Sequence, residues 1–252
     1  MNINKILCNR KGEKMINSKK FAGYLGLILL TALVLTGCSS PTQTRQDDVS
    51  DFNRISIQTI GEFIIEQGNE ESLKIEAPRD FLRYVETTVD NGTLEIGMRR
   101  GFLNSSIGKT TFTIKVKDLE EVSLSGAGAI KIFSLDTDEL SVNLTGAGSI
   151  EIDDLSTKKL DVNLHSAGAV IIAGNAEKQE ISLTGVGSYE GGDLQSDDAE
   201  INLTGAGSAV VWAEEYLDAE ISGIGSIVYF GDPEVYQNIS GLGSISSKGA
   251  HK

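Results

Sequence analysis

Residues 144–150 read LTGAGSI, and the recurrence of this seven-residue motif decides the kind of fold that the chain adopts. The copies are LSGAGAI from Leu124, LTGAGSI from Leu144, LHSAGAV from Leu164, LTGVGSY from Leu183, LTGAGSA from Leu203, ISGIGSI from Ile221 and ISGLGSI from Ile239. Successive copies are 20, 20, 19, 20, 18 and 18 residues apart. A nearly fixed period of this length indicates a repeat architecture, in which each unit packs on its neighbours.

The residues around the motif alternate between apolar and polar, as in Val142-Asn143-Leu144 and Ile150-Glu151-Ile152. A period of two is typical of β-strands, and the glycines between the strands interrupt any helix. One such unit cannot bury its own apolar face, but stacked units bury a continuous core. The sequence therefore predicts an all-β fold, a right-handed parallel β-solenoid with coils of about 20 residues, preceded by a signal-peptide helix.

The residue between the two glycines is apolar in every copy, which bears on how each coil turns. This column consists of Ala127, Ala147, Ala167, Val186, Ala206, Ile224 and Leu242. Strict alternation from the inward leucine would carry the column outward. Its apolar character suggests instead that the first glycine makes a bend and directs this residue into the core. On this interpretation, Ala147→Asp should unfold the protein.

Two further columns are small and polar, and we expect both to face solvent. The hydroxyl column is Ser125, Thr145, His165, Thr184, Thr204, Ser222 and Ser240, and the amide column is Ser123, Asn143, Asn163, Ser182, Asn202, Glu220 and Asn238. The simpler interpretation is that stacked hydroxyls and amides hydrogen-bond along the rod. The alternative is a flat recognition face for a glycan or another regular surface. Its candidate residues are Thr145, His165, Thr184, Thr204, Asn143, Asn163 and Asn202.

Residues 51–118 lack the glycine motif but keep the alternation, as in Ile55-Ser56-Ile57. Gln67-Gly68-Asn69 and Asn91-Gly92 are turn signals, and Pro78 to Val85 is compatible with a short helical turn. We interpret 51–118 as irregular leading coils and 119–246 as seven Gly-motif coils. Together they form one solenoid domain, 51–246, followed by a tail at 247–252.

The first 37 residues have the features of a signal peptide. Lys19-Lys20 precedes an uncharged stretch from Phe21 to Leu35, which is short for a membrane span and suited to a signal-peptide core. Leu35-Thr36-Gly37-Cys38 resembles the bacterial lipobox, which implies lipidation of Cys38. The alternative is a plain transmembrane anchor with a chance cysteine. Met15 is an alternative start to Met1.

Lipidation would hold an otherwise soluble body at a membrane. Ser39 and Ser40 follow the cysteine, and by resemblance to lipoprotein sorting in two-membraned bacteria this favours the outer membrane. Residues 38–50 contain little apolar character and are predicted to form a flexible tether.

Charge and cysteine content exclude several classes of function. The chain holds 22 basic and 36 acidic residues, of which six basic and one acidic lie in residues 1–37. The remainder therefore has 16 basic and 35 acidic residues and a net charge of −19, which disfavours nucleic-acid binding. Cys38 is the only cysteine after the leader, so no intrachain disulfide supports the mature fold.

The chain also resembles a known family, the head GIN domain family of autotransporter adhesins. The resemblance covers about 51–246 and rests on the repeated Leu-(Ser/Thr)-Gly-Ala-Gly-(Ser/Ala), the opening Asp51-Phe52-Asn53-Arg54-Ile55, the Glu66-Gln67-Gly68 turn and residues 91–96. It implies a β-solenoid and a cell-envelope location, and it supplies no catalytic residues. The chain departs from the repeat at His165 and Ser166, where Ser166 replaces the first glycine.

The sequence offers little support for catalysis, a cofactor or a metal site. The G-x-G motif has no third glycine and is followed by strand, so it does not fit a phosphate-binding loop. Histidines are limited to His165 and His251, and no acidic turn matches a calcium loop. We expect no enzyme. The favoured function is non-enzymatic binding or adhesion by a lipid-anchored envelope protein. The alternatives are a structural component that self-associates through its solenoid ends and, as a minor one, a glycan-active enzyme.

Overall fold

The protein is described by a computed structural model that covers residues 41–101 and 108–251. The predicted signal peptide, 1–37, and the predicted lipidation site, Cys38, lie outside these residues. Most of the described chain is β-strand, so the all-β prediction is confirmed. In the same residues we find no helix with the length and hydropathy that a bilayer span requires.

Within the described residues, the leading part of the chain forms short strands and one helical turn. These are β1 (Thr42–Asp47), β2 (Arg54–Ile57), β3 (Ile60–Gln67), β4 (Ser72–Pro78), α2 (Arg79–Leu82), β5 (Val85–Asp90), β6 (Thr93–Met98) and β7 (Thr111–Val116). The Gly-motif coils follow as β8 (Glu121–Leu124), β9 (Ala127–Ile132), β10 (Leu135–Leu144), β11 (Ala147–Leu164), β12 (Ala167–Leu183), β13 (Ser188–Leu203), β14 (Ala206–Ile221), β15 (Ile224–Phe230), β16 (Glu234–Ile239) and β17 (Leu242–Ser247).

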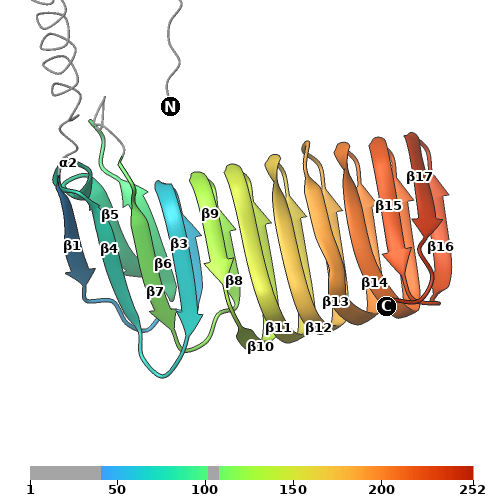
Figure 1. Cartoon of the computed structure of the whole chain (residues 1–252), viewed down its shortest axis with the longest axis horizontal. Helices are drawn as coiled ribbons and strands as arrows, with labels where there is room; N and C mark the ends of the chain where they lie inside the picture. Colours follow the sequence, from blue (N-terminus) through green and yellow to red (C-terminus); the bar gives the residue numbers. More distant parts are fainter. Residues whose placement is uncertain (1–40, 102–107, 252) are drawn as a thin grey trace, which may run out of the picture. The chain divides into compact units, whose positions relative to one another are not determined.

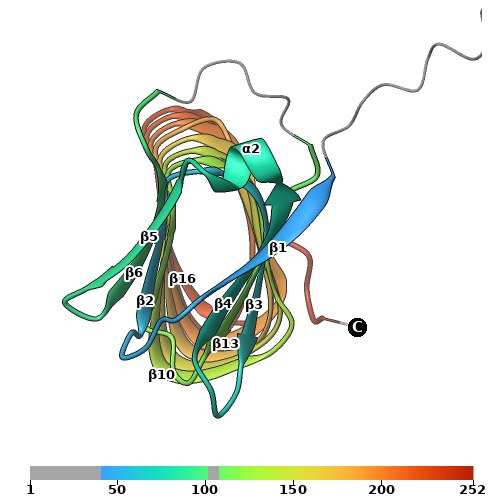
Figure 2. The same cartoon turned by 90° about the vertical axis from the view of Figure 1, so that its left-hand side faces the viewer.

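The strands stack as a parallel β-solenoid of about 6 turns, with coils about 20 residues apart (Figure 1). The first leucine of each motif pairs in register with that of the next coil, from Leu124 through Leu144 and Leu164 to Leu183 and Leu203. Viewed along the stack, the coils superpose as a flattened oval (Figure 2). These leucines point inside it and are at most 2% exposed. The predicted solenoid and its period are therefore confirmed.

The leading strands continue the same sheet and close its N-terminal end. β2 pairs in parallel with β8, and β3 pairs in parallel with β9. Beyond them the pairing becomes antiparallel, between β4 and β7 and within the β5–β6 hairpin. Asn91 and Gly92 form the hairpin turn with φ of 49° and 78°, and α2 is the helical turn expected between Pro78 and Val85. Phe81 and Leu82 of α2 are buried on the end of the core.

The predicted tether at 38–50 is wrong for residues 42–47, which form β1. This strand pairs antiparallel with β4, from Thr42 opposite Pro78 to Asp47 opposite Leu73. The Arg45 guanidinium donates hydrogen bonds to the carbonyls of Leu82 (2.9 Å) and Val85 (3.0 Å). β1 is held by backbone pairing and one side chain that satisfies carbonyls. Because these contacts need no apolar side chains, the polar composition of residues 42–47 gave no sign of a strand.

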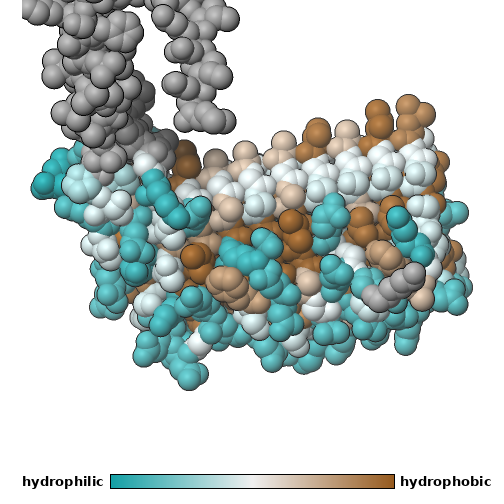
Figure 3. All heavy atoms as spheres, in the orientation of Figure 1, coloured by the Kyte–Doolittle hydropathy of each residue, from teal (hydrophilic) through white to brown (hydrophobic). Residues whose placement is uncertain are grey.

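The column between the two glycines faces solvent, so its predicted inward position is wrong. Val186 is 65% exposed, Ile224 60% and Leu242 75%, and Ala147 is exposed as well. Ile60 extends the column at its N-terminal end, because it pairs with Ala127. We call this column the apolar ridge. In Figure 3, apolar and weakly apolar residues follow the upper edge of the rod. Strict alternation, which the sequence interpretation set aside, gives the correct orientation.

The glycines serve close backbone approach and do not turn the ridge inward. A Cβ at Gly146 would lie 2.0 Å from the carbonyl oxygen of Gly126, and one at Gly148 would lie 1.8 Å from that of Gly128. The space that a side chain needs here is filled by the preceding coil. The corner therefore stacks backbone on backbone, with hydrogen bonds such as Ala147 N–H to Gly126 O at 3.0 Å.

Ser166 shows what a side chain costs at this position. Gly146 and Ala147 donate backbone hydrogen bonds to Leu124 and Gly126 of the preceding coil, but Ser166 and Ala167 make no equivalent bonds in the described structure. The Ser166 hydroxyl is also buried without a hydrogen-bond partner. The odd coil noted in the sequence thus loses corner hydrogen bonds because its Cβ holds the two backbones apart.

We expect Gly146→Ala to destabilise the protein by about 1–3 kcal/mol, because the added methyl overpacks the corner. Ala147→Asp, at the next residue, is the matched control. It should change stability by no more than about 0.5 kcal/mol, because Ala147 is exposed. Urea unfolding of the two variants measures both values. If Ala147→Asp unfolds instead, the Ala147 side chain must point into the core, against the structure.

One part of the core is polar and fully paired. Gln179 occupies the inward position of Leu160 in the preceding coil. Its side-chain oxygen accepts a hydrogen bond from the Tyr189 hydroxyl (2.9 Å), and its amide donates to Ser196 Oγ (2.8 Å). Burial raises the pKa of the Tyr189 hydroxyl well above its ordinary value. Each of these buried groups has a partner, which offsets the cost of removing it from water.

The C-terminal residues 248–251 lie along the outside of the rod. Lys248 N–H donates to Tyr229 O at 2.8 Å. The His251 ring stacks on Trp212 with centroids 4.2 Å apart, and its Nε2 lies 3.2 Å from Asp193 Oδ1. The tail thus contacts the side of the preceding coils.

Candidate functional site

One broad face of the solenoid carries three parallel columns of outward polar side chains, which we call the polar face. The first is the amide column, whose members pair in register: Asn143 with Asn163, Asn163 with Ser182, and Ser182 with Asn202. Two residues earlier in each coil lies an acidic column of Glu121, Ser141, Asp161, Glu180, Glu200 and Asp218. Two residues earlier again, a mixed column contains Glu139, Lys159, Lys178 and Asp198.

The amide column hydrogen-bonds to the acidic column more than along itself. Asn143 Nδ2 donates to Glu121 Oε1 (3.1 Å) and to Ser141 Oγ (3.2 Å). Asn163 Nδ2 donates to Asp161 Oδ1 at 2.6 Å. These bonds occupy amide N–H groups of both side chains. The predicted amide ladder therefore exists in register, but carboxylates hold its side chains.

Lysines and carboxylates form an ion-pair network on the same face. Glu180 lies 2.6 Å from Lys178 and 3.1 Å from Lys159, and Lys178 reaches Glu200 at 3.8 Å. Hydrogen bonds from Lys178 and then Lys159 lower the pKa of the Glu180 carboxyl. The hydrogen bond to Glu180 likewise raises the pKa of Lys178. These ion pairs hold carboxylates of the polar face in place. The pattern of amides in the sequence did not predict them.

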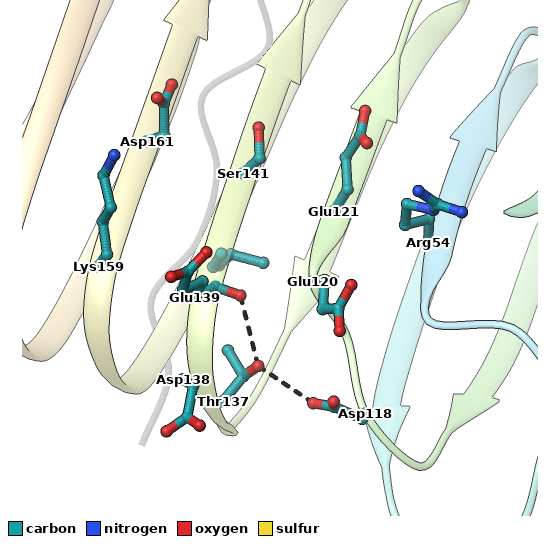
Figure 4. A pocket seen from close by; sticks show the side chains of 11 residues that line it. Arg54, Asp118, Glu120, Glu121, Thr137, Asp138, Glu139, Ser141, Lys159 and Asp161 are labelled. Carbon is teal, nitrogen blue, oxygen red and sulfur yellow. Dashed lines mark hydrogen bonds between the residues drawn. The ribbon is translucent and has the colours of Figure 1, made fainter. Parts of the chain in front are cut away.

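A depression of about 650 Å³ lies at the N-terminal part of this face. Its side chains stand in rows across neighbouring strands, with Glu121, Ser141 and Asp161 in one row and Lys159 in the next (Figure 4). Below them, the Thr137 hydroxyl donates to Asp118 at 3.1 Å. The side chains project side by side from the sheet, so they present an extended surface and do not converge on one reacting atom.

The hydroxyl column lies elsewhere, at the glycine corner beside the apolar ridge. Thr145, His165, Thr184 and Thr204 are all exposed. The His165 Nδ1 and the Thr184 hydroxyl are hydrogen-bonded across neighbouring coils, and the Thr204 hydroxyl donates to Leu183 O at 3.4 Å. The candidate residues therefore divide between two surfaces, the corner for the hydroxyl column and the polar face for Asn143, Asn163 and Asn202.

The acidic and mixed columns were not predicted from the sequence, although the signal was present. Asp161, Glu180 and Glu200 recur two residues before the amide column at the same period as the motif. Reading every outward position of the repeat, and not only the uncharged ones, would have found them. In the part of the chain that the structure describes, no cluster of three or more His, Cys, Asp or Glu side chains is arranged to hold a metal ion.

We expect Glu180→Gln to lower stability by up to about 1 kcal/mol at neutral pH, because the ion pairs are partly exposed. The folded-state pKa of Glu180 is lowered, so its contribution is present above the unfolded value and lost as pH falls through the folded one. The difference from the wild type should therefore shrink toward zero below about pH 4. Urea unfolding across this range measures it; a constant difference would contradict the assignment.

Comparison with known proteins identifies relatives along most of the chain. A family model described as "Putative auto-transporter adhesin, head GIN domain" matches residues 51–233. No curated protein matches the sequence. The solved structure of a "putative adhesin" from Bacteroides fragilis has a TM-score of 0.79 at 29% identity, covering 83% of this chain and 98% of that one.

Two Parabacteroides structures are also similar. A "Putative lipid binding protein" from Parabacteroides distasonis has a TM-score of 0.66 at 26% identity, covering 84% of this chain and 98% of that one. A "putative adhesin" from Parabacteroides merdae has a TM-score of 0.63 at 25% identity, covering 84% and 97%. These descriptions name adhesins and a binding protein, and none of the three names an enzyme.

Proposed function

The chain belongs to the family described as "Putative auto-transporter adhesin, head GIN domain", and from this premise we propose a lipid-anchored protein of the cell envelope that binds a partner without catalysing a reaction. The observation that supports this proposal most directly is the polar face. Its amides and carboxylates repeat in register from coil to coil. A surface of this kind suits an extended, repetitive partner better than a small substrate.

A neutral polysaccharide is the ligand class that fits the polar face best. Amide oxygens and carboxylates accept hydrogen bonds from sugar hydroxyls, and the lysine ammonium groups donate them. A chain of net charge −14 repels acidic polymers. A small depression lined by Asp161, Asn163, Glu180, Glu200 and Asn202 lies within the amide column.

We expect Asn163→Ala with Asn202→Ala to weaken binding to a neutral polysaccharide about tenfold or more, because two side-chain hydrogen bonds are lost. An array of neutral and acidic envelope polysaccharides identifies the ligand for the wild-type protein. The matched control is Ser188→Ala with Ser208→Ala, on the opposite face of the solenoid, which should bind like the wild type. Binding of acidic polysaccharides alone, or equal loss in the control, would contradict this site.

The apolar ridge supports a second candidate, an aliphatic ligand such as a lipid chain. Val186, Ile224 and Leu242 are its most exposed members, and one structural relative is named a lipid-binding protein. Binding of the same variants to lipid vesicles separates the two candidates. A lipid ligand would be lost with Val186→Ser and Ile224→Ser and retained with the two asparagine substitutions.

The anchoring proposal rests on the lipobox-like Leu35-Thr36-Gly37-Cys38 and the charge-free stretch before it. We expect Cys38→Ala to abolish incorporation of radiolabelled palmitate and to move the protein out of the membrane fraction. Protease treatment of intact cells then determines which side of the outer membrane carries the body. Palmitate incorporation that persists in Cys38→Ala would disprove lipidation at this residue.

A further inference from the structure

The C-terminal end of the solenoid leaves inward-facing positions open to solvent. Ile239 continues the inward leucine column and pairs with Ile221. Ile221 is 0% exposed, whereas Ile239 is 42% exposed. Val235 and Ile245 are likewise only partly buried, although their partners Leu217 and Ile227 are fully buried. Within the described residues, no segment covers this end of the core.

The backbone at this end also has unpaired hydrogen-bonding groups. β16 pairs with β14 and β17 pairs with β15, and in the described structure neither has a partner on its other side. Leu242 N–H and Lys248 N–H donate to the preceding coil. Because N–H groups alternate in direction along a strand, those of Gly243, Ile245 and Ser247 point off the end. Ser240 N–H donates to Ile221 O. By the same alternation, the N–H groups of Val235, Gln237 and Ile239 also point off the end.

The exposed edge has few of the features that keep strand edges apart. Apart from Glu234, the first residue of β16, residues 234–247 contain no Asp, Glu, Lys, Arg or Pro, in a chain of which 23% is charged. Natural proteins protect free edges with charges, prolines, bulges or covering segments. An edge with a single charge at its start and exposed apolar side chains favours pairing with another strand edge.

The N-terminal end of the solenoid is different, because it is closed. Phe81 and Leu82 of α2 are buried at this end, and Figure 2 shows α2 at the upper edge of the oval formed by the coils. The terminal strands β1 and β5 are antiparallel to their neighbours, and they carry charged residues such as Arg45, Asp47 and Glu86. A head-to-tail filament would need this end to accept the open one.

We propose that two copies of this chain pair through their open C-terminal coils and form a closed dimer. A two-fold axis across the end of the rod brings strands of opposite direction together, so the new pairs are antiparallel. β16 and β17 each have 6 residues, so each edge finds a partner of its own length. The interface is self-complementary and uses up both open ends, so assembly stops at two copies.

This dimer would place two sets of binding surfaces on one straight assembly. Where the two-fold axis pairs β16 with β16 of the second copy, the polar face of one copy meets that of the second, because β16 continues this face to the open end. A long polymer could then contact both copies, and linked sites raise the apparent affinity without new contacts. The pairing itself does not depend on which ligand the protein binds.

The test is sedimentation of the full chain, purified from membranes in mild detergent, over a concentration series. We expect the wild type to form a two-copy species that saturates. Gln237→Lys should raise the dissociation constant at least tenfold, because it places a charge of the same sign from each copy in the interface. Gln237 is exposed at the open end, so the substitution should leave the fold intact.

Asn238→Lys is the matched control, since it adds the same side chain one residue later on the outward column. This variant should dimerise like the wild type. Three results would overturn the proposal: a single-copy wild type at every concentration, assembly beyond two copies, or a dimer that Gln237→Lys leaves intact. Equal loss of the dimer in both variants would also overturn it, because it would place the contact on the outward face.

Discussion

The close approach of successive backbones at the glycine corner is the constraint on which the rest of this solenoid depends. At Gly146 and Gly148 the preceding coil fills the space that a Cβ would need. The coils can therefore hydrogen-bond through the corner without interruption, as Ala147 does to Gly126. Ser166 demonstrates the constraint within the native sequence, because the corner there lacks two hydrogen bonds and buries an unpaired hydroxyl.

Register follows from this corner and organises every surface of the molecule. Since each coil starts from the same corner, side chains at equivalent positions stack in columns along the rod. The inward columns are mostly apolar and make one continuous core. The outward columns separate by chemistry into an apolar ridge beside hydroxyls at the corner and amides beside carboxylates on the polar face. A repeated sequence is thereby converted into surfaces that are uniform along their length.

The two ends of the rod have different solutions to the same problem. Any stack of coils exposes core and backbone at its first and last members. At the N-terminal end, antiparallel strands and α2 cover the core, and Arg45 holds β1 against the carbonyls of Leu82 and Val85. At the C-terminal end, β16 and β17 keep their edges free. The asymmetry argues for pairing between like ends and against a filament.

The sequence by itself determined the β-solenoid, its period, the inward leucines and the register of the amide column, because these depend on local alternation and a repeated spacing. It could not determine the orientation of Ala147 and the rest of the ridge, since apolar character suggested burial and only the stacked backbone explains the glycines. The strand at Thr42–Asp47 was hidden for a related reason, because pairing with β4 does not require apolar side chains. The tertiary structure alone decided which columns share a face, because this depends on contacts between coils that local patterns do not encode.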